Sequence, residues 1–184
     1  MFKLGKAKAS PPLKKLRPEI LLHPNIPKPL HGLAPRNILG QEWWDMQRKA
    51  AYAKTGDRCA ACGVHKSEAE YHKWVEAHEL YDINYKKGLM TFKEVVALCH
   101  SCHNFIHSGR MGMMVQQGTM DANKMIDILN RGEEILIKNK LKHPKDPKYV
   151  AEWDKWRLVL NGKKYKGKFE TYDDWYDFYV GAQE

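Results

Sequence analysis

The sequence lacks any run of the roughly 18 apolar residues that a membrane-spanning helix needs. Its first residues carry several lysines and no apolar stretch of the kind that directs secretion. It also lacks internal repeats, and 184 residues suffice for one compact domain with an additional arm. We therefore expect no membrane association and a cytoplasmic location.

Acidic residues are scarce relative to basic ones. Lys and Arg total 31 against 22 Asp and Glu, which gives a formal net charge of +9. Such an excess favours a polyanionic partner, with nucleic acid first and an anionic membrane second. Hydrophobic residues make up 43% of the chain, which is enough for a modest core and excludes wholesale disorder.

Proline is rare except near the start of the chain. Seven of the nine prolines lie between Pro11 and Pro35, and Glu19 is the only acid in residues 1–40. Repeated proline removes backbone donors and disfavours a helix, so we predict a basic, extended arm over residues 1–38. Such an arm is either a disordered tail or a segment that lies along the body or along a nucleic-acid backbone.

Cysteine occurs only four times, as two Cys-x-x-Cys pairs formed by Cys59, Cys62, Cys99 and Cys102. A two-residue gap lets both sulfurs of a pair reach one ion, and four thiolates complete a closed tetrahedral site. Disulfides are disfavoured in a reducing compartment, and two symmetric pairs argue against a thioredoxin-like centre. The pattern predicts a structural Zn²⁺ site.

Histidine is concentrated near these pairs, with six of nine in residues 65–107. The segment around Glu76 and His78 alternates as a strand does, which places both side chains on one face. The run VVALC predicts a second strand. A helix beginning after the second cysteine pair places His103 and His107 four residues apart on one face, the spacing with which two imidazoles bind one metal.

These residues resemble a known family. The segment EAHE at 76–79, followed by EVVALCHSCHNFIH at 94–107, is similar to the HNH endonucleases of the ββα-metal class in their zinc-ribbon form. The similarity covers roughly residues 57–110. It implies an α+β fold with a ββα-metal core and a structural zinc, in a nuclease-like domain over residues 39–118.

The resemblance implies a role for each matching residue. His78 matches the general base, and His103 and His107 match the residues that bind a catalytic Mg²⁺ or Mn²⁺ and hold the scissile phosphate. Ala77 stands where the family usually has an acid or His before the base. We expect Glu76, or less favourably Glu79, to supply the metal-binding carboxylate instead.

A second departure concerns the middle Asn of the family name. Glu94 stands at that position and is assigned to the catalytic residues, together with His78, His103 and Glu76. Another register is open in which His78 is a metal ligand and Glu79 is the base.

The flanking segments have recognisable local signals. Helices are predicted over residues 41–54 and 120–141, a hairpin turning at Asn161–Gly162, and a short aromatic helix with Thr171 as N-cap. Residues 119–184 form a basic and aromatic extension. The candidate nucleic-acid contacts are Arg110, Lys163, Lys164 and Lys166.

Together these signals predict a metal-dependent HNH endonuclease that hydrolyses DNA phosphodiester bonds and nicks one strand per active site. DNA is the expected partner, with RNA left open, in the cytoplasm of a bacterial or phage-infected cell. The alternatives are a non-catalytic zinc-ribbon module that binds nucleic acid and a subunit of a phage or defence assembly. In the latter, the arm or the C-terminal extension would dock a protein partner.

Overall fold

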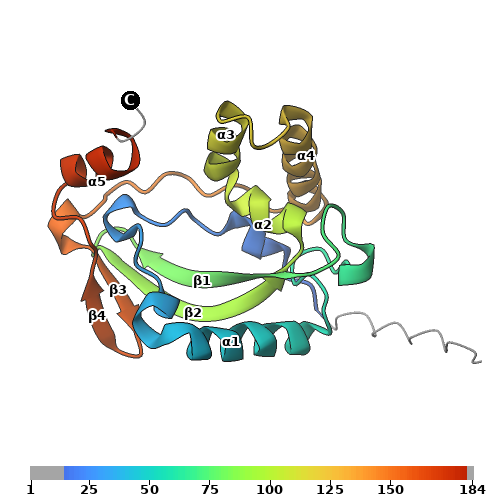
Figure 1. Ribbon diagram of the computed structural model, residues 1–184, viewed down its shortest axis with the longest axis horizontal. Helices are drawn as coiled ribbons and strands as arrows, with labels where there is room; N and C mark the ends of the chain where they lie inside the picture. The colour runs from blue at the N-terminus through green and yellow to red at the C-terminus, as the bar shows by residue number, and fades with distance from the viewer. Residues whose placement is uncertain (1–14, 182–184) are drawn as a thin grey trace, which may run out of the picture.

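The computed structural model describes residues 15–181, which form an α+β fold with one four-stranded mixed sheet. The strands are β1 (Glu76–Asn84), β2 (Leu89–Leu98), β3 (Arg157–Leu160) and β4 (Lys163–Lys166), in that order across the sheet (Figure 1). β1 pairs antiparallel with β2, β2 pairs parallel with β3, and β3 pairs antiparallel with β4. Within the described residues, five α-helices surround this sheet.

β2, the second strand of the hairpin, is longer than the sequence pattern predicts. The run VVALC is only the end of the ten-residue β2, and Cys99 already caps the helix that follows. The first strand begins at Glu76, so Trp74 lies outside it with 54% of its surface exposed. A bulge between Leu80 and Tyr81 shifts the register. His78 lies opposite Val96, and both side chains are buried.

Helix α1 (Pro35–Thr55) packs against one face of the sheet, mainly on β2. It is kinked at Gly40, whose φ of +84° interrupts the helical backbone, so the predicted helix over residues 41–54 corresponds to its second part. Gly56 ends the helix in the left-handed conformation that glycine adopts without strain. This end leads directly into the first cysteine pair.

Three helices lie on the opposite face of the sheet: α2 (His100–Ile106), α3 (Ser108–Gln116) and α4 (Ala122–Lys138) (Figure 1). α4 packs on α2, and a Cβ added to Gly132 would lie 2.0 Å from the ring of Phe105. The glycine that weakens the predicted helix therefore permits this close packing. No helix in the described part of the chain has the length and apolar character to cross a membrane.

The N-terminal segment is not simply extended. Its described part forms two 3₁₀ turns, η1 (Pro18–Leu22) and η2 (Lys28–Leu30), and buries Ile20, Leu21 and Leu30. Proline is tolerated in the first turn of a helix, where its missing N–H has no intrahelical partner, and each of these turns begins in that way. From residue 15 the arm thus lies along the body, while residues 1–14 of the predicted arm lie outside the described residues.

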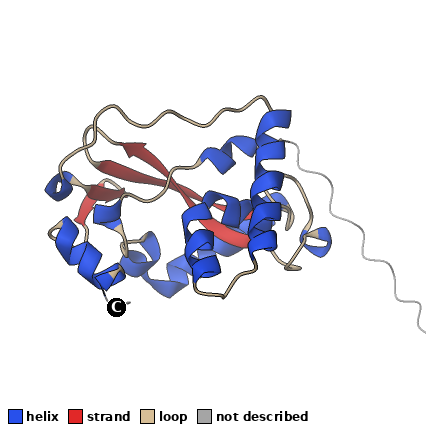
Figure 2. Cartoon of the chain, turned by 90° about the horizontal axis from the view of Figure 1, so that it is seen from above, coloured by secondary structure: helices blue, strands red, loops and turns tan. Residues whose placement is uncertain are grey.

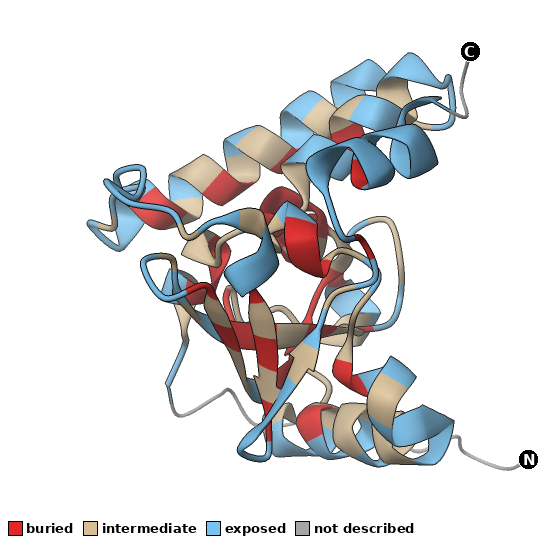
Figure 3. Cartoon of the chain, turned by 90° about the vertical axis from the view of Figure 1, so that its left-hand side faces the viewer, coloured by how far each residue is buried: buried red, intermediate tan, exposed pale blue. Residues whose placement is uncertain are grey.

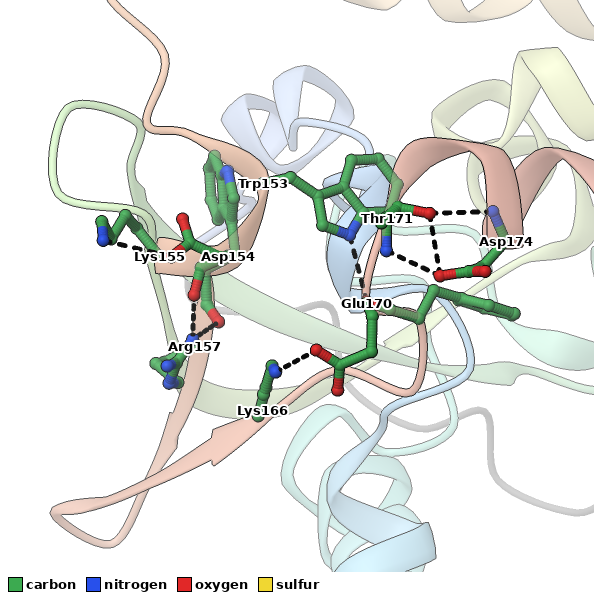
Figure 4. Close-up of polar contacts among 10 residues, drawn as sticks. Trp153, Asp154, Lys155, Arg157, Lys166, Glu170, Thr171 and Asp174 are labelled. Carbon is green, nitrogen blue, oxygen red and sulfur yellow. Dashed lines mark hydrogen bonds and ion pairs between the residues drawn. The ribbon is translucent and has the colours of Figure 1, made fainter.

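The C-terminal extension confirms two local predictions. The hairpin of β3 and β4 turns at Asn161 and Gly162, with φ values of +50° and +77°. Helix α5 (Tyr172–Tyr179) begins at Thr171 with a capping box formed with Asp174 (Figure 4). Because β3 pairs with β2, the hairpin extends the main sheet instead of forming a separate unit.

A long connection without helix or strand, residues 141–152, leads from α4 towards this hairpin (Figure 2). Burial is concentrated in the sheet and in α2, whereas the outer faces of α1, α4 and α5 are exposed (Figure 3). The largest buried cluster therefore surrounds the helix that carries both Cys102 and His103.

Candidate metal centres

The four cysteines form one compact cluster. Their Sγ atoms all lie within 4.8 Å of one another, and Cys62 Sγ is 3.8 Å from Cys99 Sγ. Four sulfurs placed tetrahedrally at the usual Zn–S distance of about 2.3 Å would be about 3.8 Å apart. The cluster can therefore hold a structural metal such as zinc, as the spacing of the pairs predicts.

Local backbone geometry builds this cluster. The amide of Gly63 donates to the carbonyl of Cys59 at 2.8 Å, which closes a tight turn, and Gly63 has a φ of +80°. The amide of Ala60 donates to the carbonyl of Ala97 on β2 at 2.8 Å, which ties the first pair to the sheet. The second pair lies at the start of α2, with Cys99 as its N-cap and Cys102 in its first turn. The cluster therefore lies where β2 ends and α2 begins.

Burial makes the cysteine cluster a closed site. Cys59 is fully buried, and Cys99 and Cys102 are nearly so. Hydrogen bonds with the other thiols, joined by burial, raise the pKa of the Cys102 thiol well above its usual value. Several thiolates at this spacing would repel one another strongly, and a bound divalent cation would remove that repulsion.

A second cluster contains three histidines from different elements. His78 lies on β1, His103 on α2, and His107 at the junction between α2 and α3. The ring centroids are 5.3 Å apart for His78 and His103, 5.1 Å for His78 and His107, and 4.9 Å for His103 and His107. One ring nitrogen of each lies within 4.8 Å of the others, so the three can bind one cation.

The surroundings lower the pKa of two of these imidazoles, His78 and His107. Burial, together with His103 and the other nearby histidines, lowers the pKa of His78 to about 2. Burial, together with His103, Arg110 and His23, lowers the pKa of His107 to about 4. Metal ligation requires a neutral ring with a free lone pair. Consistent with this requirement, the buried Nε2 of His78 has no hydrogen-bond partner among the described residues.

Glu76 lies beside the histidine cluster and uses both carboxylate oxygens. Nδ1 of His103 donates to Oε2 at 2.5 Å, and Nδ1 of His100 donates to Oε1 at 2.8 Å. Burial raises the pKa of Glu76, but these hydrogen bonds outweigh it and hold the pKa at about 2. A carboxylate on Nδ1 fixes the orientation of an imidazole and leaves Nε2 for a metal.

The other two acids that the sequence singles out lie in different surroundings. Glu94 accepts ion pairs from Arg17 at 2.7 Å and Lys54 at 3.2 Å, and it belongs to none of the clusters of ligand atoms in the described chain. Glu79 accepts a hydrogen bond from the Tyr81 hydroxyl at 2.8 Å through Oε2. Its Oε1 is buried without a partner in residues 15–181, and burial raises its pKa.

Sequence reasoning missed three histidines near the site. His23 accepts a hydrogen bond from the amide of Tyr81 at 2.8 Å, and its ring lies 5.1 Å from that of His78. His72 and His100 form, with Glu76, a further set whose ligand atoms lie within 4.8 Å of one another. For His100, its place three residues before His103 on one helix was a usable signal, whereas nothing local points to His23.

The histidine cluster borders a cavity. A cavity of about 400 Å³ is lined by Glu76, His100, His103, His107 and Arg110, among others. Arg110 is thus on the same surface as the three predicted metal ligands Glu76, His103 and His107. The site is open on this side, in contrast to the cysteine cluster.

The predicted lysine contacts lie elsewhere. Lys163, Lys164 and Lys166 are exposed on β4, and Lys166 pairs with Glu170 at 2.5 Å (Figure 4). β4 is at the opposite edge of the sheet from β1, which at the usual strand spacing is roughly 14 Å away. A nucleic acid that contacts both these lysines and the histidine cluster must therefore span the width of the sheet from β4 to β1.

No protein-family model, no curated protein and no solved structure matches this chain.

Proposed function

We propose that the protein is a metal-dependent HNH endonuclease that hydrolyses DNA phosphodiester bonds. The observation that carries the proposal is the convergence of His78, His103 and His107 beside a four-cysteine cluster. The proposal is supported by the order of β1, β2 and α2, two antiparallel strands followed directly by a helix. The excess of basic residues suits a nucleic-acid substrate.

His78 is proposed as a metal ligand and not as the base. Its Nε2, which has no hydrogen-bond partner within residues 15–181, and the short distances to the rings of His103 and His107 support a set of three imidazoles. Because a ring nitrogen of each histidine lies within 4.8 Å of the others, a shared cation is the partner that suits His78 best. This assignment corresponds to the second of the two registers that the sequence leaves open.

Glu79 is the proposed general base in this register. Its Oε1 has no hydrogen-bond partner within the described chain, and the residue lines a cavity together with His107 and Arg110. Its carboxylate can take the proton from a water that attacks the phosphorus, while Arg110 binds a phosphate oxygen. When bound, the divalent cation supplies positive charge that stabilises the charge developing on the phosphate and on the leaving oxygen.

Glu76 is proposed as a positioning residue. Both of its oxygens accept hydrogen bonds from imidazoles, so it acts through His103 and His100. Glu94 is proposed to hold the arm and α1 to the sheet through Arg17 and Lys54, at the family's Asn position. It therefore braces the fold and takes no direct part in the chemistry.

The test is a plasmid assay with matched variants. Wild-type protein should nick supercoiled DNA with Mg²⁺ or Mn²⁺. Glu79→Gln should lose about 10²- to 10⁴-fold in rate and keep its affinity for Mn²⁺, as expected for loss of a general base. His78→Ala should lose both activity and Mn²⁺ affinity, measured by titration calorimetry. His143→Ala, which removes an exposed histidine paired with Glu133, is the control.

Two results would contradict these assignments. Full Mn²⁺ affinity in inactive His78→Ala would return the role of base to His78. Binding of DNA without cleavage under any metal would instead make the protein a non-catalytic nucleic-acid-binding module.

A further inference from the structure

A second and larger cavity also reaches the histidine cluster and shares His107 and Arg110 with the first. Its volume is about 740 Å³, within the range of ligand-binding pockets. One end is formed by Glu79, His107 and Arg110, the residues of the proposed site. The other end is formed by Trp175 and Tyr179 of α5, so the C-terminal extension completes a space that begins at the metal ligands.

The aromatic end is held rigidly. Nε1 of Trp175 donates to Nδ1 of His31 at 3.1 Å, and Nε2 of that imidazole donates to the carbonyl of Ile26 at 2.9 Å. Tyr179 lies one helical turn from Trp175, with ring centroids 5.6 Å apart. The capping box at Thr171 fixes the start of this helix (Figure 4). A preorganised aromatic wall of this kind is suited to stacking a planar ligand.

Charge around the cavity favours a phosphate-bearing ligand. Lys28, Arg36 and Arg110 line it, and Glu79 is the one acid among the described residues that do so. Lys28 Nζ lies over the Trp175 ring, 4.6 Å from its centre, and Trp175 is buried, whereas Tyr179 is 38% exposed. The cation is thus held at the aromatic wall, and Tyr179 offers the face on which a base can stack. Apolar side chains, such as those of Leu30 and Met113, form much of the remaining wall.

We infer that this cavity holds an unpaired base of the strand being cut, next to the scissile phosphate. The preferred substrate is therefore single-stranded or locally unpaired nucleic acid, since a base stacked within a duplex cannot place its face on an aromatic side chain without leaving the helix. The aromatic wall takes the base, and the cations take the flanking phosphates. This inference rests on the proposed function, because it takes the cut to occur at Glu79 and His107.

The first arm of the test measures cleavage of one DNA sequence as a single strand and as a duplex. The single strand should be cut at least about tenfold faster in kcat/KM, and one abasic position near the cut should lower that value about tenfold. Tyr179→Leu should be about tenfold slower on the intact strand and insensitive to the abasic position. Tyr176→Leu, on the same helix but outside the cavity, should behave as wild type.

The second arm does not depend on cleavage. Binding of a fluorescently labelled single strand, measured by anisotropy without added divalent metal, should weaken about tenfold in Tyr179→Leu and not in Tyr176→Leu. If this difference appears but no DNA is cut, the proposed function fails and the base-binding site stands. If DNA is cut and Tyr179→Leu equals wild type in both arms, the base-binding site fails and the nuclease stands.

Discussion

The two clusters differ in chemistry and exposure although one helix serves both. Cys102 and His103 are consecutive residues of α2, and a step of about 100° around the helix sends them to different sites. In the cysteine cluster, three of the four residues are almost entirely buried and Cys62 is partly buried. The histidine cluster consists of imidazoles, two of which line an open cavity.

This difference suits the two clusters to different roles. A closed set of four thiolates leaves a metal no open position, so the binding energy of a metal there would contribute to folding. A set of three imidazoles beside a cavity leaves a metal open positions for other ligands. The first cluster joins the ends of β2 and α1 to the start of α2. In the proposed nuclease, the second cluster would hold the catalytic metal.

The largest effect is expected from breaking the closed cluster. Cys99→Ser removes one thiolate and should abolish zinc binding, with a loss of more than about 4 kcal/mol in the free energy of unfolding. Zinc content and thermal denaturation measure both effects. Ser101→Ala, a buried neighbour outside the cluster, should keep its zinc. A zinc-free Cys99→Ser protein as stable as wild type would overturn the structural role.

A smaller effect, confined to the open cluster, is expected for Glu76→Gln. Glutamine has one acceptor oxygen where glutamate has two, so it cannot accept hydrogen bonds from His100 and His103 at the same time. The orientation of the His103 ring is therefore less well fixed. Mn²⁺ affinity or cleavage rate should fall about 10- to 100-fold, while zinc content is unchanged. Calorimetry and metal analysis on the same sample distinguish these outcomes. Loss of zinc in this variant would show that the two clusters are not separable.

Gly132→Ala changes α4 where it packs against α2, the helix that both clusters share. The added methyl group would approach the Phe105 ring to 2.0 Å, so α4 must move away from α2. Overpacking of this kind lowers the free energy of unfolding by about 1–3 kcal/mol. This loss exceeds the gain of about 1 kcal/mol from the higher helix propensity of alanine. Chemical denaturation should therefore show a less stable protein with normal zinc content. Increased stability would mean that α2 and α4 pack less closely than described.

The smallest effect is expected far from both clusters. Replacing Lys163, Lys164 and Lys166 by alanine should weaken DNA binding modestly and reduce its salt dependence by up to about three units of slope. The rate of cleavage at saturating DNA should stay the same. Alanine at Lys138, Lys140 and Lys142 removes equal charge and is the matched control. Equal losses in the two triple variants would mean that β4 makes no specific contact.

Several elements could be predicted because their signals are local. The Asn161–Gly162 turn and the Thr171 cap depend on a few neighbouring residues, and both occur as predicted. The cysteine spacing predicts its cluster for the same reason, since each pair forms its own turn. The placement of His103 near His107 follows from the four-residue repeat of a helix.

Other features depend on contacts between distant residues. The first half of β2 lacks a clear alternating pattern and becomes a strand by pairing with β1 and β3. The arm, predicted as extended, forms short turns because Ile20, Leu21 and Leu30 find a core to enter. Glu94 was assigned to the catalytic residues, and only the fold brings Arg17 and Lys54 to it.

The sequence alone determined the ligand types, their spacing and the local turns, because these properties belong to short segments of the chain. Tertiary structure alone decided which side-chain acceptors find a hydrogen-bond partner. It placed His23 against Tyr81, directed Glu76 to two imidazoles and left one oxygen of Glu79 without a hydrogen-bond partner in the part of the chain that the structure describes. It also brought α5 to the cavity beside His107, across nearly 70 residues of sequence. Burial and long-range packing set these relations, and no local pattern encodes them.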